Sequence, residues 1–160
     1  MWLWQLACQW RRIAQEEPFP GRAAEAGDQL GCRVLVARLV RDVMRLCFLL
    51  ERRYAPYPKW LGTAFARLNS AATVGPLLVV VLTAPDWPAA QQPLVAAYQQ
   101  VAIRHNHLGL AMPLDPSPRP FHDRPYLIVD AGRFTDACLA AMTDRALAAL
   151  PPIGACAWAR

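Results

Sequence analysis

The segment from residue 34 to residue 50 constrains the fold more than any other part of this chain. Nearly every residue in it is apolar, and its polar side chains recur three or four positions apart: Arg38, Arg41, Asp42 and Arg45. The helical repeat of 3.6 residues places these four side chains on one narrow stripe and leaves the rest of the surface apolar. The pattern therefore predicts a mostly buried central helix with a single basic face.

Two roles for this stripe are open. It could line a cleft for an anion or for another domain. Alternatively, it is solvated, with Asp42 paired to Arg38 and Arg45, because residues three or four positions apart are neighbours on a helix.

Apolar spacing and proline breaks divide the rest of the chain into further elements. Residues 18–27 and the proline-rich residues 110–125 read as irregular, Tyr126–Val129 as a short strand, and residues 74–83 as buried helix rather than strand. The other predicted helices cover residues 2–17, 28–53, 58–69, 88–107 and 133–150. The sequence predicts a mainly α protein: a bundle of five or six helices with a proline-rich excursion and at most one short strand pair.

Composition narrows the class of ligand. The chain has 160 residues, 55% of them hydrophobic and 18% charged, which suits one folded domain. Its net charge of +5 is scattered, without a block of like charges or an aromatic–basic alternation, so we expect no nucleic-acid partner. A small phosphate-bearing ligand or an acidic partner surface fits better. The longest uncharged apolar run, residues 76–85, is too short to span a membrane. We expect a cytoplasmic protein.

The sequence contains no group of residues with the spacing of a standard catalytic or metal site. The 5 cysteines form no C-x-x-C pair, so buried thiols in a reducing compartment are expected. His105 and His107 are two positions apart and point to nearly opposite sides of a helix, which disfavours a shared metal. No pair of aspartates has the D-x-D spacing that holds magnesium on a triphosphate. We assign no catalytic residue and no metal site.

The segment from Arg52 to Trp60 holds the best candidate site. Lys59 is the one lysine among 17 basic side chains. Pro58 is preorganised for the first helical position, which puts Lys59 in a first turn, where the helix dipole disfavours a cation. A lysine there makes sense if an anion is bound beside it. The alternative is a solvated lysine without a ligand.

Three stretches resemble one bacterial family: Gly21 to Asp28, Met44 to Phe65, and more weakly His105 to Leu108. The second contains the run R-Y-x-P-Y-x-K-W-x-G-x-A-F. Together they resemble the domain of unknown function numbered 4037, over about residues 1–150. That domain commonly forms the C-terminal part of proteins with an N-terminal nucleotidyltransferase fold.

The resemblance implies a single helical domain over residues 1–150, similar to the C-terminal half of kanamycin nucleotidyltransferase-like enzymes, which closes one wall of the active cleft. The N-terminal nucleotidyltransferase domain, with its Gly-Ser and paired-acid motifs, is absent here. Residues 151–160 form a divergent tail, which departs from the expected acidic end. Both departures suggest a fragment or a truncated product. A nucleotide triphosphate with magnesium is expected only together with the missing domain.

Two functions remain as hypotheses. In the first, the domain is not catalytic alone and offers a basic and aromatic wall to a nucleotide or another anionic ligand, beside a nucleotidyltransferase-like domain or partner chain. Lys59 would contact phosphate, with charge added by Arg53 and Arg45. The aromatic residues would stack on a base or pack a helix junction; they are Tyr54, Tyr57 and Trp60. The alternative is a structural or protein-interaction module without a ligand, favoured by three tryptophans near the start of the chain.

Overall fold

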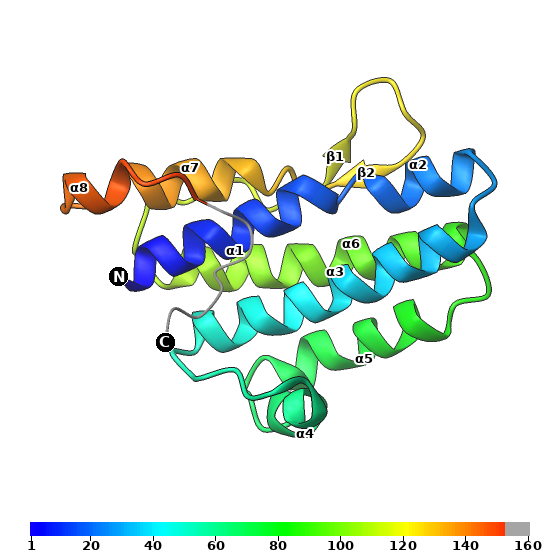
Figure 1. The fold of residues 1–160 in the computed structure, drawn as a ribbon, viewed down its shortest axis with the longest axis horizontal. Coiled ribbons are helices and arrows are strands. Elements are labelled where there is room, and N and C mark those ends of the chain that lie inside the picture. The colour runs from blue at the N-terminus through cyan, green and yellow to red at the C-terminus, as the bar shows by residue number, and fades with distance from the viewer. Residues whose placement is uncertain (153–160) are drawn as a thin grey trace.

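The computed structural model describes residues 1–152, and it is mainly helical (Figure 1). Within this range, five helices reach nine residues or more: α1 (Trp2–Glu16), α3 (Gln29–Leu50), α5 (Ala71–Thr83), α6 (Trp87–His107) and α7 (Gly132–Ala140). The shorter elements are α2 (Phe19–Glu25), the 3₁₀ turn η1 (Pro58–Trp60), α4 (Leu61–Phe65), α8 (Arg145–Ala148) and the strands β1 (Arg119–Pro120) and β2 (Leu127–Ile128). The predicted mainly α bundle with one short strand pair is confirmed.

Helix α3 lies at the centre of the bundle, as its apolar surface predicts. It packs against α1 and α2 on one side, against α5 on another and against α6 behind (Figure 1). Helix α7 covers the opposite side of α1. The two strands pair in antiparallel fashion, with Arg119 opposite Ile128. Helix α3 is therefore the central helix of the bundle, and α5 and α7 lie at the edges.

Side-chain caps set several helix starts. The Asp28 carboxylate accepts the backbone N–H of Gly31 at 2.8 Å, which confirms the predicted start of α3. Asp86 caps α6 in the same way. Prolines inside α5 and α6 each remove one backbone hydrogen bond, and the residues four positions earlier, Ala72 and Ala89, are exposed. Water can satisfy the carbonyls left over on these faces, so both helices continue through their prolines.

Several boundaries differ from the prediction, three of them outside α3. Residues 18–27 contain α2 rather than only a loop, because Pro20 stands in its first turn, where no N–H is needed. The predicted helix over residues 133–150 stops after Ala140, and a second helix begins where the Asp144 carboxylate accepts the N–H of Leu147 at 3.0 Å. The predicted helix over residues 58–69 is only η1 followed by the five-residue α4. The predicted tail falls mostly on residues 153–160, outside the described range.

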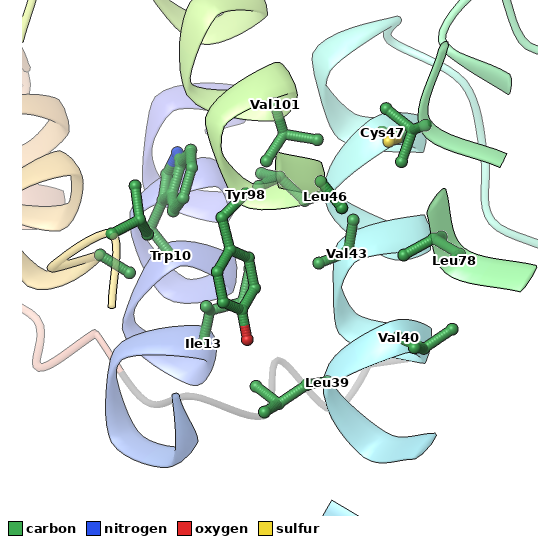
Figure 2. Packing of buried hydrophobic residues seen from close by; sticks show 14 of the residues in the cluster. Trp10, Ile13, Leu39, Val40, Val43, Leu46, Cys47, Leu78, Tyr98 and Val101 are labelled. Carbon is green, nitrogen blue, oxygen red and sulfur yellow. The ribbon is translucent and has the colours of Figure 1, made fainter. Parts of the chain in front are cut away.

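Trp10 anchors the core between α1, α6 and α7. It is fully buried, stacks on Phe134 with ring centroids 4.4 Å apart, and donates its indole N–H to Nδ1 of His105 at 3.1 Å. Figure 2 shows Trp10 and Ile13 of α1 on one side of Tyr98, and Leu39 and other buried residues of α3 on the other. His105 is buried, whereas His107 is exposed, so the two histidines do face different surroundings.

The interaction-module hypothesis assumed that the tryptophans near the start of the chain form an exposed apolar face. The structure does not show such a face. Trp10 lies in the core, and Trp2 and Trp4 are half-buried. The Trp2 indole N–H donates to the backbone carbonyl of Leu49 at 2.7 Å, so this side chain ties the start of α1 to the end of α3.

Glu17 ties the other end of α1 to the chain near α7. Its two carboxylate oxygens accept the backbone N–H groups of Val129 and Ala131, at 3.0 and 2.8 Å. Burial raises the pKa of Glu17 to about 7, although these two hydrogen bonds favour the ionised form. Burial acts on His105 in the opposite direction, and lowers its pKa to about 4.

We predict that these two groups give the native state opposing pH dependences. The unfolded chain protonates His105 near pH 6.5, so its stabilising contribution is lost as the pH falls from 6.5 to 4. The unfolded chain ionises Glu17 near pH 4.5, so the contribution of Glu17 is lost as the pH rises from 4.5 to 7. Each shift corresponds to about 3 kcal/mol at most.

Urea unfolding of His105→Gln and Glu17→Gln across pH 4 to 7 tests this prediction. Relative to the wild type, His105→Gln should gain stability as the pH falls, and Glu17→Gln should gain stability as the pH rises. Parallel profiles for both variants and the wild type would contradict the assigned pKa shifts.

Candidate functional site

The segment that follows α3, residues 51–60, carries most of the predicted site residues, and we call it the α3–α4 loop. It begins with a tight helix ending, in which the N–H of Arg53 reaches the carbonyl of Phe48 at 2.8 Å and the N–H of Arg52 reaches that of Leu49 at 3.1 Å. This ending requires a left-handed residue, and Arg52 takes that conformation with φ of 53°. The helix therefore stops at Leu50, earlier than the predicted Arg53.

Arg52 holds this conformation with help from α1. A non-glycine residue with positive φ is strained by about 1 kcal/mol. The guanidinium carbon of Arg52 lies 3.8 Å from the ring centroid of Trp2, a cation–π contact that offsets part of this strain. Sequence reasoning missed both residues, because glycine is the usual signal for this position and an arginine gives none.

Glu51 fixes the loop on its other side. Its carboxylate accepts the backbone N–H groups of Asn69 and Ser70, at 2.9 and 2.7 Å, just before α5 begins. Partial burial acts to raise the pKa of Glu51, but hydrogen bonds from Ser70 and Asn69 and the charge of Arg104 outweigh it and lower the pKa overall. The start of the loop is thus held both to α1 and to the start of α5.

The predicted aromatic residues of this loop point outward. Tyr54 is 68% exposed, Tyr57 76% and Trp60 54%. Arg53 and Lys59 are exposed as well. We call these five residues the aromatic–basic surface. Two roles were left open for the aromatics, and the structure does not bury them at a helix junction.

Lys59 sits in a weaker helix dipole than predicted. Pro58 does occupy the first turn, but η1 has three residues and α4 has five, so few aligned peptides stand behind it. The Lys59 ammonium lies 5.6 Å from the ring centroid of Trp60. Its surroundings are those of a solvent-facing cation beside an indole, and the helix terminus adds little.

Arg45 and the basic stripe of α3 are arranged differently from the prediction. Arg45 is half-buried on α3, two turns before the loop. Asp42 is only 1% exposed, so it does not belong to a wet stripe. Its carboxylate pairs with Arg12 of α1 at 3.1 Å and with Arg41 at 3.5 Å, rather than with Arg38 and Arg45. The tilt of α1 across α3 brings Arg12 to this position, which the sequence of α3 alone cannot reveal.

Arg38 of the stripe joins the same network through Glu16. Glu16 accepts a hydrogen bond from Arg38, and it pairs with Arg12 at 3.2 Å. These ion pairs join α1 to α3 and use the charges that could otherwise hold an anion. Of the predicted site residues, the aromatic–basic surface groups five, and the structure places Arg45 apart on α3.

Other site types find no support in residues 1–152. There, no three histidine, cysteine, aspartate or glutamate side chains are arranged to hold a metal ion. No helix in this part of the chain has the length and apolar character to cross a membrane. Cys8, Cys32, Cys47 and Cys138 are buried and form no disulfide within it.

Comparison with known proteins supports part of the resemblance. The family model described as Domain of unknown function (DUF4037) matches residues 1–61. The match includes α1, α2, α3 and the α3–α4 loop. Searches of curated proteins and of solved structures found no match. The resemblance is thus supported for the part of the chain that ends with the aromatic–basic surface.

We predict that Arg52→Gly and Arg52→Ala differ in stability. Both variants lose the contact with Trp2, but only glycine relieves the left-handed strain. Arg52→Gly should therefore be more stable than Arg52→Ala by about 1 kcal/mol. Urea unfolding of the two proteins measures this difference. Equal stabilities, or a more stable alanine variant, would show that the left-handed conformation at Arg52 carries no strain.

Proposed function

We propose that this chain is a helical domain of a nucleotidyltransferase-like protein, and that its aromatic–basic surface forms one wall of a cleft for a nucleotide or another anionic ligand. The domain is not catalytic alone. The other wall comes from a nucleotidyltransferase-like domain or partner chain, and a nucleotide triphosphate with magnesium binds only where both are present.

One observation carries this proposal: three aromatic side chains and two cations stand exposed on one loop, whose start is held to α1 and to the start of α5. Exposed rings offer stacking surfaces for a base, and the cations Arg53 and Lys59 offer charge for phosphate. Exposed aromatic side chains add little to stability, so their accumulation over seven consecutive residues is better explained by a binding role.

The position of the loop suits a wall shared with a second domain. The end of α3 and the start of α1 lie at the same end of the bundle, joined by the contacts of Trp2 (Figure 1). A domain joined ahead of α1 would therefore lie beside the aromatic–basic surface. Similarity to the C-terminal half of kanamycin nucleotidyltransferase-like enzymes is part of this proposal and rests on the sequence resemblance.

We predict that a nucleoside triphosphate raises the melting temperature of the wild-type chain and that Lys59→Glu abolishes this rise. A ligand at a hundredfold excess over Kd stabilises the native state by about 2.7 kcal/mol, which thermal unfolding detects. The exposed Lys59 adds little to folding, so the variant without ligand should melt within a few degrees of the wild type.

Arg145→Glu provides a matched control for this experiment. Arg145 is also exposed and also stands in a first helical turn, but on α8, beyond α7. The Arg145→Glu variant changes the net charge by the same amount as Lys59→Glu but leaves the α3–α4 loop intact. It should therefore keep the response to the nucleotide. Equal loss of response in both variants would indicate a general charge effect. No response in the wild type would favour a structural or protein-interaction module without a ligand.

We further predict that the chain alone does not transfer a nucleotidyl group in the presence of magnesium. The reaction needs paired carboxylates to hold the metal on the triphosphate, and the sequence offers no such pair. Incubation with labelled nucleotide and aminoglycoside, amine or RNA acceptors measures transfer. Label transfer that disappears in Lys59→Ala would overturn the view that this domain needs a catalytic partner.

A further inference from the structure

Arg52 was not among the predicted site residues, yet its side chain is held in place at the start of the α3–α4 loop. Its guanidinium carbon lies over the ring of Trp2, 3.8 Å from the centroid. The ring is itself fixed, because the indole N–H of Trp2 donates to the carbonyl of Leu49 at 2.7 Å. A side chain that is already ordered loses less rotamer entropy when it binds a ligand. Arg52 is therefore a cation prepared for binding, at the end of the bundle where α1 begins (Figure 1).

The charge of Arg52 has no anionic partner within residues 1–152. There, no carboxylate lies within ion-pair distance of its guanidinium. Glu51 precedes it in the chain, but both oxygens of Glu51 accept backbone N–H groups just before α5. The next residue, Arg53, is exposed and adds a second cation. The N–H groups of Arg52 that do not face the indole can therefore donate to a ligand.

The backbone at this position gives no reason for an arginine. Arg52 has φ of 53°, a left-handed conformation that glycine adopts without strain. Within residues 1–152, the other non-glycine residues with positive φ are His122 and Asp130, whose types adopt it more readily. A positive charge does suit the end of a helix, but Arg53 supplies one without this strain. Because strained residues cluster at ligand-binding sites, a binding role of the side chain explains Arg52 better.

We propose that Arg52, positioned by Trp2, contacts a phosphate group of the ligand that the aromatic–basic surface binds. This inference rests on the proposed function, because it concerns the ligand of the same loop. The guanidinium can donate two parallel N–H bonds to two phosphate oxygens while its face stays on the indole. The phosphate group then lies at the α1 end of the loop, which is the end that a domain joined ahead of α1 would approach. Arg52 thereby selects phosphate-bearing ligands over uncharged ones.

The test measures binding of two titrants to the full chain by isothermal titration calorimetry, without magnesium: a nucleoside triphosphate and inorganic tripolyphosphate. Arg52→Gly removes the guanidinium and introduces a residue that suits the left-handed backbone. It should weaken binding of the nucleoside triphosphate at least about tenfold, the usual effect of losing a hydrogen bond to a charged group. Circular dichroism checks that the variant folds. Wild-type affinity in Arg52→Gly would overturn the inference.

Two further variants separate a phosphate contact from an effect on net charge. Arg145→Gln removes one positive charge on α8 and should bind the triphosphate as the wild type does. Arg52→Lys keeps the charge but not the forked donor, so it should bind more tightly than Arg52→Gly. Equal weakening by Arg145→Gln and Arg52→Gly, or equal affinities of the two Arg52 variants, would show that the ligand does not contact this side chain.

A matched pair of variants tests Trp2 as the positioning residue. Trp2→Phe and Trp2→Leu both lose the indole N–H that reaches Leu49, but only phenylalanine keeps a ring beside the guanidinium. Trp2→Phe should therefore bind the triphosphate about twofold to fivefold more tightly than Trp2→Leu. Equal affinities would show that the ring does not prepare Arg52 for the phosphate.

The outcomes also separate this inference from the proposed function. If neither titrant binds the wild type, the proposed function fails together with it. If Lys59→Glu loses the response to the nucleoside triphosphate and Arg52→Gly keeps it, only the contact of Arg52 fails. If tripolyphosphate binds the wild type as tightly as the nucleoside triphosphate, and Arg52→Gly weakens both, Arg52 holds phosphate but the aromatic side chains hold no base.

Discussion

The burial of Asp42 is the constraint on which the arrangement of the bundle depends. Helix α3 lies at the centre, yet it carries this carboxylate with 1% of its surface exposed. A buried charge without a partner would cost about 3–5 kcal/mol. Arg12 supplies the partner at 3.1 Å, and it comes from α1 rather than from α3. The position of α1 across α3 is therefore set by a charge that must be neutralised, in addition to the apolar contacts around Trp10.

Helix α1 is then held along its whole length by polar contacts to other parts of the chain. The Trp2 indole fixes its start to the end of α3, Arg12 fixes its middle, and Glu17 fixes its end to the backbone before α7. Each contact uses a side chain that is at least half-buried, where hydrogen bonds to charged groups count for more than at the surface. Burial raises the pKa of Tyr98 in the core, and the negative charges of Glu17, Asp42 and Glu16 raise it further. The same framework holds the start of the α3–α4 loop, because Trp2 contacts both Leu49 and Arg52.

The sequence predicted those elements whose position depends on residues close to them in the chain. The apolar spacing located α1, α3 and α6, and the helix predicted from residue 28 does begin there, where Asp28 caps it. The prediction was wrong where a distant residue decides the outcome: Asp42 pairs with Arg12, which lies 30 residues away in the chain. The early end of α3 was missed for a similar reason, because an arginine in the left-handed conformation depends on a tryptophan from α1. The candidate site stays a prediction. The exposure of its aromatic side chains could not be read from the sequence, because the same residues could have packed a helix junction.

The aromatic–basic surface owes its position to the central helix. Helix α3 is buried along its middle but ends at Leu50, and the chain that follows it reaches the solvent. The start of this loop is held to α1 by the contact of Arg52 with Trp2, and to the start of α5 by the hydrogen bonds that Glu51 accepts. Exposed rings and cations are the groups that stack on planar ligands and pair with anionic ones. Under the proposed function, a ligand would therefore contact the loop and would not need to enter the core around α3.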